Sequence, residues 1–246
     1  MERVKMIELS HISKQYGKTL AVDDLTLRIP KGEIFGFIGP NGAGKTTTIK
    51  MMGGILIPTA GSIHICGIPM KKEPEAAKQK IGFIPDRPYL YEKLTGLEFL
   101  KFIADLYHMN TGRFKEKALN NLKLFSLADW YDELIESYSH GMKQRLIMAA
   151  AMMHDPEVLI VDEPMVGLDP IGIKLVKDLF KDLAAKGTTV FLSTHTLQVA
   201  EDLCHRIGII NKGVLTALGS PQDLKQEYQA TDDNLEQLFL RLTSNE

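Results

Sequence analysis

The stretch at residues 39–47, GPNGAGKTT, combines the residue types that bind a phosphate group. Glycine adopts positive φ at little cost, so successive backbone N–H groups can turn inward and form a concave site for an anion. The spacing G-x-x-x-x-G-K-[ST] places Gly39, Gly44, Lys45 and Thr46 in the pattern of a phosphate loop. A structural glycine turn is the alternative, and the flanking elements decide between the two.

A phosphate loop needs a strand before it and a helix after it. Residues 33–38 are apolar and β-prone, which predicts the strand, and residues 47–53 predict a helix that ends at Gly53-Gly54. In this arrangement Lys45 bridges the β- and γ-phosphates of a nucleotide, and the Thr46 hydroxyl binds Mg²⁺. The loop residues expected to hold the nucleotide are Asn41, Gly42, Ala43, Gly44, Lys45, Thr46 and Thr47.

Two acidic residues follow another predicted strand further along the chain. Residues 158–161, VLIV, are apolar throughout, as expected of a strand buried on both faces, and Asp162-Glu163 come directly after them. Open α/β sheets place ligands where such strands end. Asp162 can hold the Mg²⁺ ion bound by Thr46, and Glu163 can orient or deprotonate a water that attacks the γ-phosphate. A pair of solvated acids is the alternative, but acids beside buried aliphatic residues need a partner.

The elements that position these groups predict an α/β fold with a parallel sheet. Alternating apolar residues over the first thirty positions predict antiparallel strands that form an N-terminal β-subdomain. A helical period begins near Thr95, which forms a possible capping box with Glu98, and predicts an inserted helical subdomain over about 86–155. Further strands are expected at 62–66, 81–84, 189–193 and 207–210, with a helix at 173–185 between them.

The end of the chain and its composition set further limits. A stripe of leucines and phenylalanine at 235–242 predicts a helical extension, about 221–246, that packs on the body.

The net charge of −2, from 29 Lys and Arg against 31 Asp and Glu, gives no general attraction to nucleic acid. Cys66 and Cys204 are expected to be small buried side chains in a reducing cytosol. No segment reaches the roughly 18 apolar residues of a membrane helix, so we expect a separate chain to span any membrane.

The order of these motifs resembles the ATP-binding subunit of an ABC transporter. The phosphate loop, the helical insert, SHGMKQ at 139–144, the acidic pair at 162–163, GLDP at 167–170 and STH at 193–195 follow one another as in that family. The resemblance covers nearly the whole chain and implies a single ABC ATPase domain, 1–246, with a P-loop NTPase core. It also implies that the chain binds and hydrolyses ATP with Mg²⁺.

In this family two ATPase subunits face each other head to tail and hold two ATP molecules between them. Each ATP contacts the phosphate loop of one subunit and the signature segment of the other, usually Leu-Ser-Gly-Gly-Gln. Here the matching segment at 138–142 is YSHGM, which keeps Ser139 and Gly141. Both are expected to bind the partner's ATP from the start of a helix, where free N–H groups and the helix dipole favour an anion.

The resemblance assigns four further residues. His195 is expected to reach the γ-phosphate as a switch residue, and Asp169 lies in a loop that crosses the dimer interface. Tyr16 matches the aromatic residue that stacks on adenine. Asp86 stands where the family usually has a glutamine that contacts Mg²⁺ or its water and senses the membrane partner; it is shorter and charged, and could still approach the metal.

The implied function is an ATPase at the cytoplasmic face of the cell membrane that powers a separate integral-membrane permease. The second subunit can be identical or different, and the permease selects the cargo. The signature variant and the C-terminal stripe resemble those of drug, antibiotic and polysaccharide exporters, which favours export over import.

Two other functions are disfavoured by the sequence. An ABC ATPase that acts on ribosomes or DNA usually carries two fused modules or coiled-coil inserts, whereas this chain has one phosphate loop, no sustained heptads and no basic run. No nucleic-acid partner is therefore expected. A regulatory subunit with an inactive site is disfavoured because Glu163 and His195 are both present.

Overall fold

The central element is a six-stranded sheet in the order β10-β9-β3-β8-β7-β6. The computed structural model describes residues 4–87, 89–227 and 235–243. The strands of this sheet are β3 (Ile34–Ile38), β6 (Ile81–Ile84), β7 (Val158–Asp162), β8 (Thr189–Thr194), β9 (Arg206–Asn211) and β10 (Val214–Gly219). All neighbours are parallel except β10, which runs antiparallel to β9. Every residue of β3, β7 and β8 is buried, which explains their continuous apolar sequences.

A second, antiparallel sheet packs near the first in the order β2-β1-β4-β5. Its strands are β1 (Lys5–Tyr16), β2 (Thr19–Pro30), β4 (Ala60–Ile65) and β5 (Ile68–Pro69). The buried face of this sheet shares one hydrophobic core with α1 (Lys45–Met52) and with Phe35 and Phe37 of β3. Because side chains alternate along a strand, Ile34 and Ile38 of β3 enter a second core on the other face of the central sheet.

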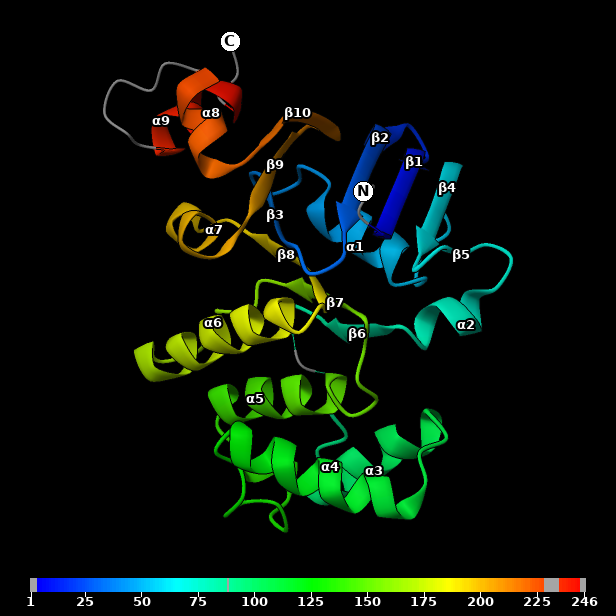
Figure 1. Ribbon diagram of the computed structural model, residues 1–246, viewed down its shortest axis with the longest axis vertical. Coiled ribbons are helices and arrows are strands. Elements are labelled where there is room, and N and C mark those ends of the chain that lie inside the picture. The colour runs from blue at the N-terminus through cyan, green and yellow to red at the C-terminus, as the bar shows by residue number, and fades with distance from the viewer. Residues whose placement is uncertain (1–3, 88, 228–234, 244–246) are drawn as a thin grey trace.

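The remaining helices pack mainly against that second core. They are α3 (Gly96–Leu106), α4 (Thr111–Leu124), α5 (His140–Ala151), α6 (Pro170–Ala185), α7 (Leu197–Leu203), α8 (Pro221–Glu227) and α9 (Leu235–Thr243), while the short α2 (Pro74–Lys78) lies beside β5 and β6. Figure 1 shows α3, α4 and α5 gathered at one end of the molecule, away from the antiparallel sheet. The expected α/β fold with a parallel sheet, an antiparallel sheet and helices between strands is confirmed.

The local sequence patterns predicted where the helices lie more accurately than where each helix begins. The Thr95–Glu98 capping box is present, with the Glu98 N–H donating to Thr95 and Glu98 accepting from the Thr95 N–H. The helix after the phosphate loop begins at Lys45 rather than Thr47. Gly44 occupies its N-cap position, and no side chain caps the first turn. The helix expected at 173–185 begins at Pro170, since Asp169 caps it and proline suits the first turn.

The C-terminal stripe packs as expected within the described residues. Leu235 and Leu238 of α9 are buried, and Phe239 and Leu242 lie against the same core. Residues 228–234 and 244–246 of the expected extension lie outside the described part. The limits of the helical insert and of the extension therefore stay predictions.

The two cysteines differ in burial. Cys204 is buried, and burial raises the pKa of its thiol to about 12. Cys66 is only half-buried rather than buried as expected, because it lies in the turn between β4 and β5 at positive φ. Burial still raises the pKa of the Cys66 thiol to about 11, so both are thiols rather than thiolates at neutral pH.

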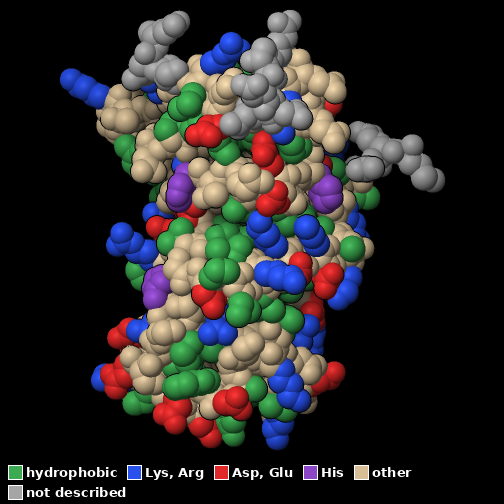
Figure 2. All heavy atoms as spheres, turned by 90° about the vertical axis from the view of Figure 1, so that its left-hand side faces the viewer, with side chains coloured by type: hydrophobic (Ala, Val, Ile, Leu, Met, Phe, Trp, Pro, Cys, Tyr) green, Lys and Arg blue, Asp and Glu red, His purple; other side chains and the backbone are tan. Residues whose placement is uncertain are grey.

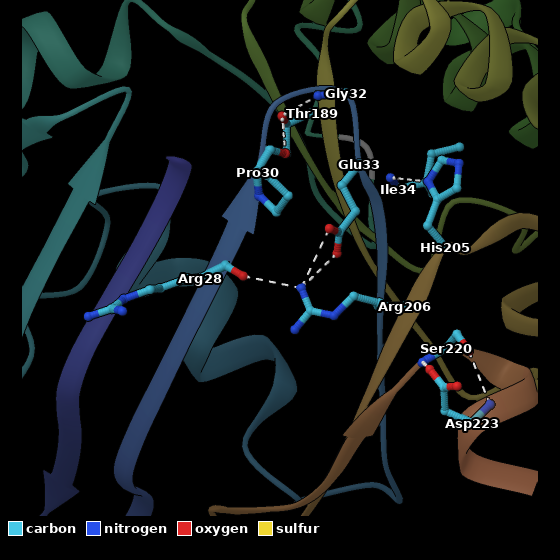
Figure 3. A network of polar contacts seen from close by, with 10 residues as sticks. All are labelled: Arg28, Pro30, Gly32, Glu33, Ile34, Thr189, His205, Arg206, Ser220 and Asp223. Atoms are coloured by element: carbon cyan, nitrogen blue, oxygen red, sulfur yellow. Dashed lines mark hydrogen bonds and ion pairs between the residues drawn. The ribbon is translucent and has the colours of Figure 1, made fainter. Parts of the chain in front are cut away.

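A polar network joins the turn between β2 and β3 to the neighbouring strands (Figure 3). Arg206 of β9 pairs with the buried Glu33 carboxylate at 3.1 Å and also donates to the Arg28 carbonyl. The Ile34 N–H donates to Nδ1 of His205, and the Thr189 hydroxyl bridges Gly32 and Pro30. These contacts lie at the start of β3, so they fix the strand at the end opposite the phosphate loop.

The surface shows both signs of charge. On the face in Figure 2, lysines and arginines alternate with acidic and hydrophobic side chains. None of the helices in the described ranges is both long and apolar enough to cross a lipid bilayer.

Candidate nucleotide-binding site

The phosphate loop connects β3 to α1 and encloses a small cavity. The cavity measures about 160 Å³ and is lined by Ala21, Pro40 and residues 41–47. Gly44 has a φ of +112°, and a Cβ atom there would lie 2.5 Å from the Ala21 carbonyl oxygen. A Cβ atom on Gly39 would lie 2.3 Å from the Ile210 carbonyl oxygen, so glycine is required at both positions. The sequence pattern and the conformation of the loop therefore agree.

Lys45 lies under this loop with only 7 % of its surface exposed. Its ammonium donates hydrogen bonds to the carbonyl oxygens of Gly39, at 2.6 Å, and Pro40, at 3.2 Å. Burial lowers the pKa of Lys45, and the nearby Glu163 and Asp162 carboxylates oppose that shift. Within the described residues Lys45 forms no ion pair, so its charge remains available to an anion in the loop.

Asp162 is held at the end of β7 by hydroxyl groups from two other elements. The Thr46 hydroxyl donates to Oδ2 at 3.2 Å, and the Ser193 hydroxyl donates to Oδ1. The carboxylate is 4 % exposed, and both of its oxygens are engaged. The structure thus brings together Thr46 and Asp162, two of the three residues expected to bind Mg²⁺, and the third, Asp86, is not in contact with them.

Ser193 is a contact that the sequence analysis missed. It pairs directly with Asp162 because β7 and β8 are adjacent parallel strands in that register. The available signal was a hydroxyl residue two positions before His195, near the end of a buried strand. Its significance depends on which strands are neighbours, and that order is not encoded in local spacing.

Glu163 has an unusual backbone conformation. Its φ is +49°, a left-handed value that is uncommon for residues other than glycine and costs on the order of 1–3 kcal/mol. Its N–H donates to the Ser193 carbonyl at 3.2 Å, and its Oε1 lies 2.9 Å from Nδ1 of His195. The side chain of Glu163 is 18 % exposed and that of His195 is 61 % exposed. The chain therefore places an acid and a histidine in contact beside the loop, facing solvent.

The signature residues lie on a different part of the molecule. Ser139 caps α5 by accepting a hydrogen bond from the Met142 N–H at 3.2 Å, and it is exposed. The His140 ring occupies the space where Gly167 lacks a side chain, so the start of α5 lies against the 165–169 segment. The helix α1 belongs to one core and α5 to the other, and within the described residues no hydrogen bond joins Ser139 or Gly141 to Lys45.

The other predicted residues are positioned as follows. Asp169 is exposed and caps α6 through the Gly172 N–H at 2.9 Å. Tyr16 ends β1 with 45 % of its surface exposed and lies beside the Lys14 ammonium. Asp86 is exposed just after β6, and it forms no hydrogen bond or ion pair with another described residue. The structure does not bring Asp86 into contact with Thr46 or Asp162.

The loop, the acid at the end of β7 and the parallel sheet define an α/β protein that binds a nucleoside triphosphate. A family model described as ABC transporter matches residues 22–166. The chain belongs to the ABC transporter family, as an ATP-binding subunit with ATPase activity.

Relatives with known names agree with this assignment. The chain is 41 % identical over 219 residues to the linearmycin resistance ATP-binding protein LnrL of Bacillus subtilis, covering 89 % of this chain and 70 % of that protein. It is also 41 % identical over 211 residues to the bacitracin transport ATP-binding protein BcrA of Enterococcus faecalis, covering 85 % of this chain and 68 % of that protein.

Solved structures show the same fold. The structure of an ATP-binding subunit of an ABC transporter matches with a TM-score of 0.92 and 32 % identity, covering 97 % of this chain and all of the other. A dimeric ATP-binding cassette in a post-hydrolysis state with ADP and Pi matches with a TM-score of 0.78 and 26 % identity, covering 87 % and 98 % of the two chains.

Proposed function

We propose that this chain is the ATPase subunit of an exporter, powers a separate integral-membrane permease from the cytoplasmic face of the membrane, and acts as a dimer around two ATP molecules. The observation that carries the dimer is the separation of the phosphate loop from Ser139 and Gly141. The helix α1, which follows the loop, packs in the core on one face of the central sheet, whereas α5, whose start carries Ser139 and Gly141, packs in the core on the other face. A second subunit would supply the missing signature residues to each ATP.

The surface around the 166–171 segment supports a subunit contact there. Val166 is 45 % exposed and Ile171 is 80 % exposed, beside the exposed Asp169. Apolar side chains next to a polar rim are typical of the core of a protein interface. This segment lies against the start of α5, so a partner that binds it also meets Ser139.

The roles of the loop follow from its donors. The N–H groups of the loop that have no partner within it, together with those at the start of α1, would bind the β- and γ-phosphates. Lys45 would exchange its carbonyl partners for phosphate oxygens, which form stronger, charge-assisted hydrogen bonds. Tyr16 would stack on the adenine ring, because its aromatic face is exposed at the end of β1.

The donor set fits Mg²⁺ bound together with a nucleotide. Mg²⁺ prefers oxygen ligands, and it is usually held by one or two carboxylates together with substrate phosphates. The Thr46 hydroxyl and the Asp162 carboxylate provide adjacent oxygens, whereas the described residues contain no cluster of three or more acidic, histidine or cysteine side chains that could hold a metal alone. When bound, Mg²⁺ would neutralise charge on the β- and γ-phosphates.

Glu163 would act as the general base in hydrolysis. It would accept a proton from water as the water oxygen attacks the γ-phosphorus, and the bond between that phosphorus and the ADP oxygen would break. His195, in contact with the Glu163 carboxylate, would orient that group and reach the γ-phosphate. The strained backbone at Glu163 supports a functional position, since such strain persists where the surrounding structure imposes it.

The export role is supported by relatives rather than by the site. The names of LnrL and BcrA refer to resistance and transport of antibiotics. The test is co-purification from native membranes with a tagged copy of this chain. A multi-span membrane protein should be recovered with ATP, and a Ser139→Arg variant that blocks the dimer should lose it. Recovery of no membrane protein under either condition would contradict the proposed permease partner.

Asp86→Ala should separate coupling from metal binding. Because Asp86 is exposed and forms no hydrogen bond or ion pair with a described residue, we expect the basal ATPase rate of the isolated chain to stay unchanged, and the stimulation of that rate by the permease to fall several-fold. The measurement is phosphate release with and without the permease in lipid. Asp105→Ala, an exposed acid of α3, is the control and should change neither rate. A loss of basal activity in Asp86→Ala would instead assign Asp86 to the metal site.

A further inference from the structure

A second and larger cavity lies away from the phosphate loop. It measures about 580 Å³, within the range typical of small-molecule sites. It lies among the end of α1, β4, β5 and α2, which gather at the right of Figure 1. Gly54, just after α1, is part of its wall, whereas the phosphate loop is at the other end of the same helix. A ligand here and a nucleotide would therefore occupy separate places.

The lining of this cavity is mainly apolar. Ile63 and Met70, which are 4 % and 8 % exposed, belong to the hydrophobic core and form its inner part. Leu56, Ile57 and Pro58 form a wall from the loop after α1. Ile57 is 75 % exposed. An apolar ligand would remove this surface from water.

One lysine lines this site and a second lies beside it. Lys71 is the charged residue among those that line the cavity. The Lys78 side chain lies against Gly54, where its Cε would be 2.7 Å from an added Cβ atom. Neither lysine forms an ion pair with a described residue, although Glu73 and Glu75 are nearby in sequence. The neighbouring Lys80, in contrast, pairs with Glu157 at 2.7 Å. Two unpaired ammonium groups beside an apolar cavity favour an anionic head on an apolar body.

We propose that this cavity, defined by Leu56–Ile57 on one wall, Ile63 and Met70 inside and Lys71 at the mouth, binds a free anionic amphiphile of the fatty-carboxylate class. The apolar chain would lie on Ile63 and Met70, and the carboxylate would pair with Lys71, while Lys78 beside Gly54 would add positive charge near the cavity. This inference is independent of the proposed transport function, because none of these residues belongs to the nucleotide site.

The test is calorimetric titration of the full chain with decanoate, decylamine and decanol. We expect one decanoate per chain, with decylamine and decanol bound at least about tenfold more weakly because they lack the anionic head. Lys71→Glu should weaken decanoate about tenfold or more. Lys72→Glu, an equal charge change at the adjacent exposed lysine that does not line the cavity, is the matched control and should have little effect.

Further measurements keep the result interpretable. ATP affinity should be unchanged in both lysine variants, which shows that they are folded, and saturating ATP should not displace decanoate. The proposal is overturned if decanoate does not bind, if Lys71→Glu and Lys72→Glu weaken it equally, or if ATP displaces it. The proposal is also overturned if Lys71→Glu reduces co-sedimentation of the chain with phosphatidylglycerol vesicles but leaves decanoate affinity unchanged. That result would indicate a contact with a membrane surface instead of a ligand in the cavity.

Discussion

Glu163→Gln should lower the rate of ATP turnover by about 100-fold or more, the range contributed by a general base, while ATP still binds. Glutamine has nearly the same shape as glutamate, and its amide oxygen can still accept a hydrogen bond from Nδ1 of His195, whose present partner is Glu163 Oε1 at 2.9 Å. The amide cannot accept a proton from water, so the loss falls on the chemical step. Phosphate release under single-turnover conditions and binding of a fluorescent ATP analogue measure the two effects separately.

The same variant should also change the oligomeric state. If ATP holds two subunits together and hydrolysis releases them, then blocking hydrolysis should favour an ATP-bound dimer, which light scattering detects. Glu157→Gln is the control, because Glu157 lies just before β7 and pairs with Lys80 away from the site. Glu157→Gln should keep normal turnover. Normal hydrolysis by Glu163→Gln would show that another group activates the water.

Local sequence patterns were sufficient for the phosphate loop and for most strands. The glycine spacing at 39–44 specifies backbone conformation directly, since a side chain at Gly39 or Gly44 would collide with a neighbouring carbonyl. The strand expected at 81–84 has those bounds, and the strands at 158–162 and 189–194 extend the expected ones by one residue. These elements were predictable because burial on both faces requires an unbroken apolar run.

The missing information was non-local. The Ser193–Asp162 contact depends on the order and register of β7 and β8, and spacing along the chain does not specify either. Glu163, with its positive φ, donates its N–H to the Ser193 carbonyl, a contact made across the same pair of strands. The exposed position of Asp86 likewise follows from how the chain leaves β6, which composition does not determine.

Lys45→Ala should weaken ATP binding by about 10- to 100-fold, the cost of removing a hydrogen bond to a charged group. Lys45 is buried beneath the loop, where a cation is desolvated, as the lowered pKa of its ammonium indicates. That desolvation strengthens its interaction with a triphosphate, because charges attract more strongly where water is excluded. Isothermal titration with ATP and Mg²⁺ measures the change, and the ATPase rate should fall with it.

A loss of affinity could also arise from unfolding, and the structure offers a way to separate the two. Within the described residues the Lys45 ammonium donates hydrogen bonds only to the Gly39 and Pro40 carbonyls. Without nucleotide, the alanine variant should therefore unfold cooperatively, with a thermal midpoint near that of the wild type. At the same ATP concentration, ATP should raise the midpoint of the wild type by more than that of the variant, because the stabilisation by a ligand grows with its affinity for the folded state. Lys50→Ala, an exposed lysine in the last turn of α1, should behave as wild type. Equal ATP affinity in Lys45→Ala and Lys50→Ala would mean that the triphosphate binds elsewhere than the 39–47 loop.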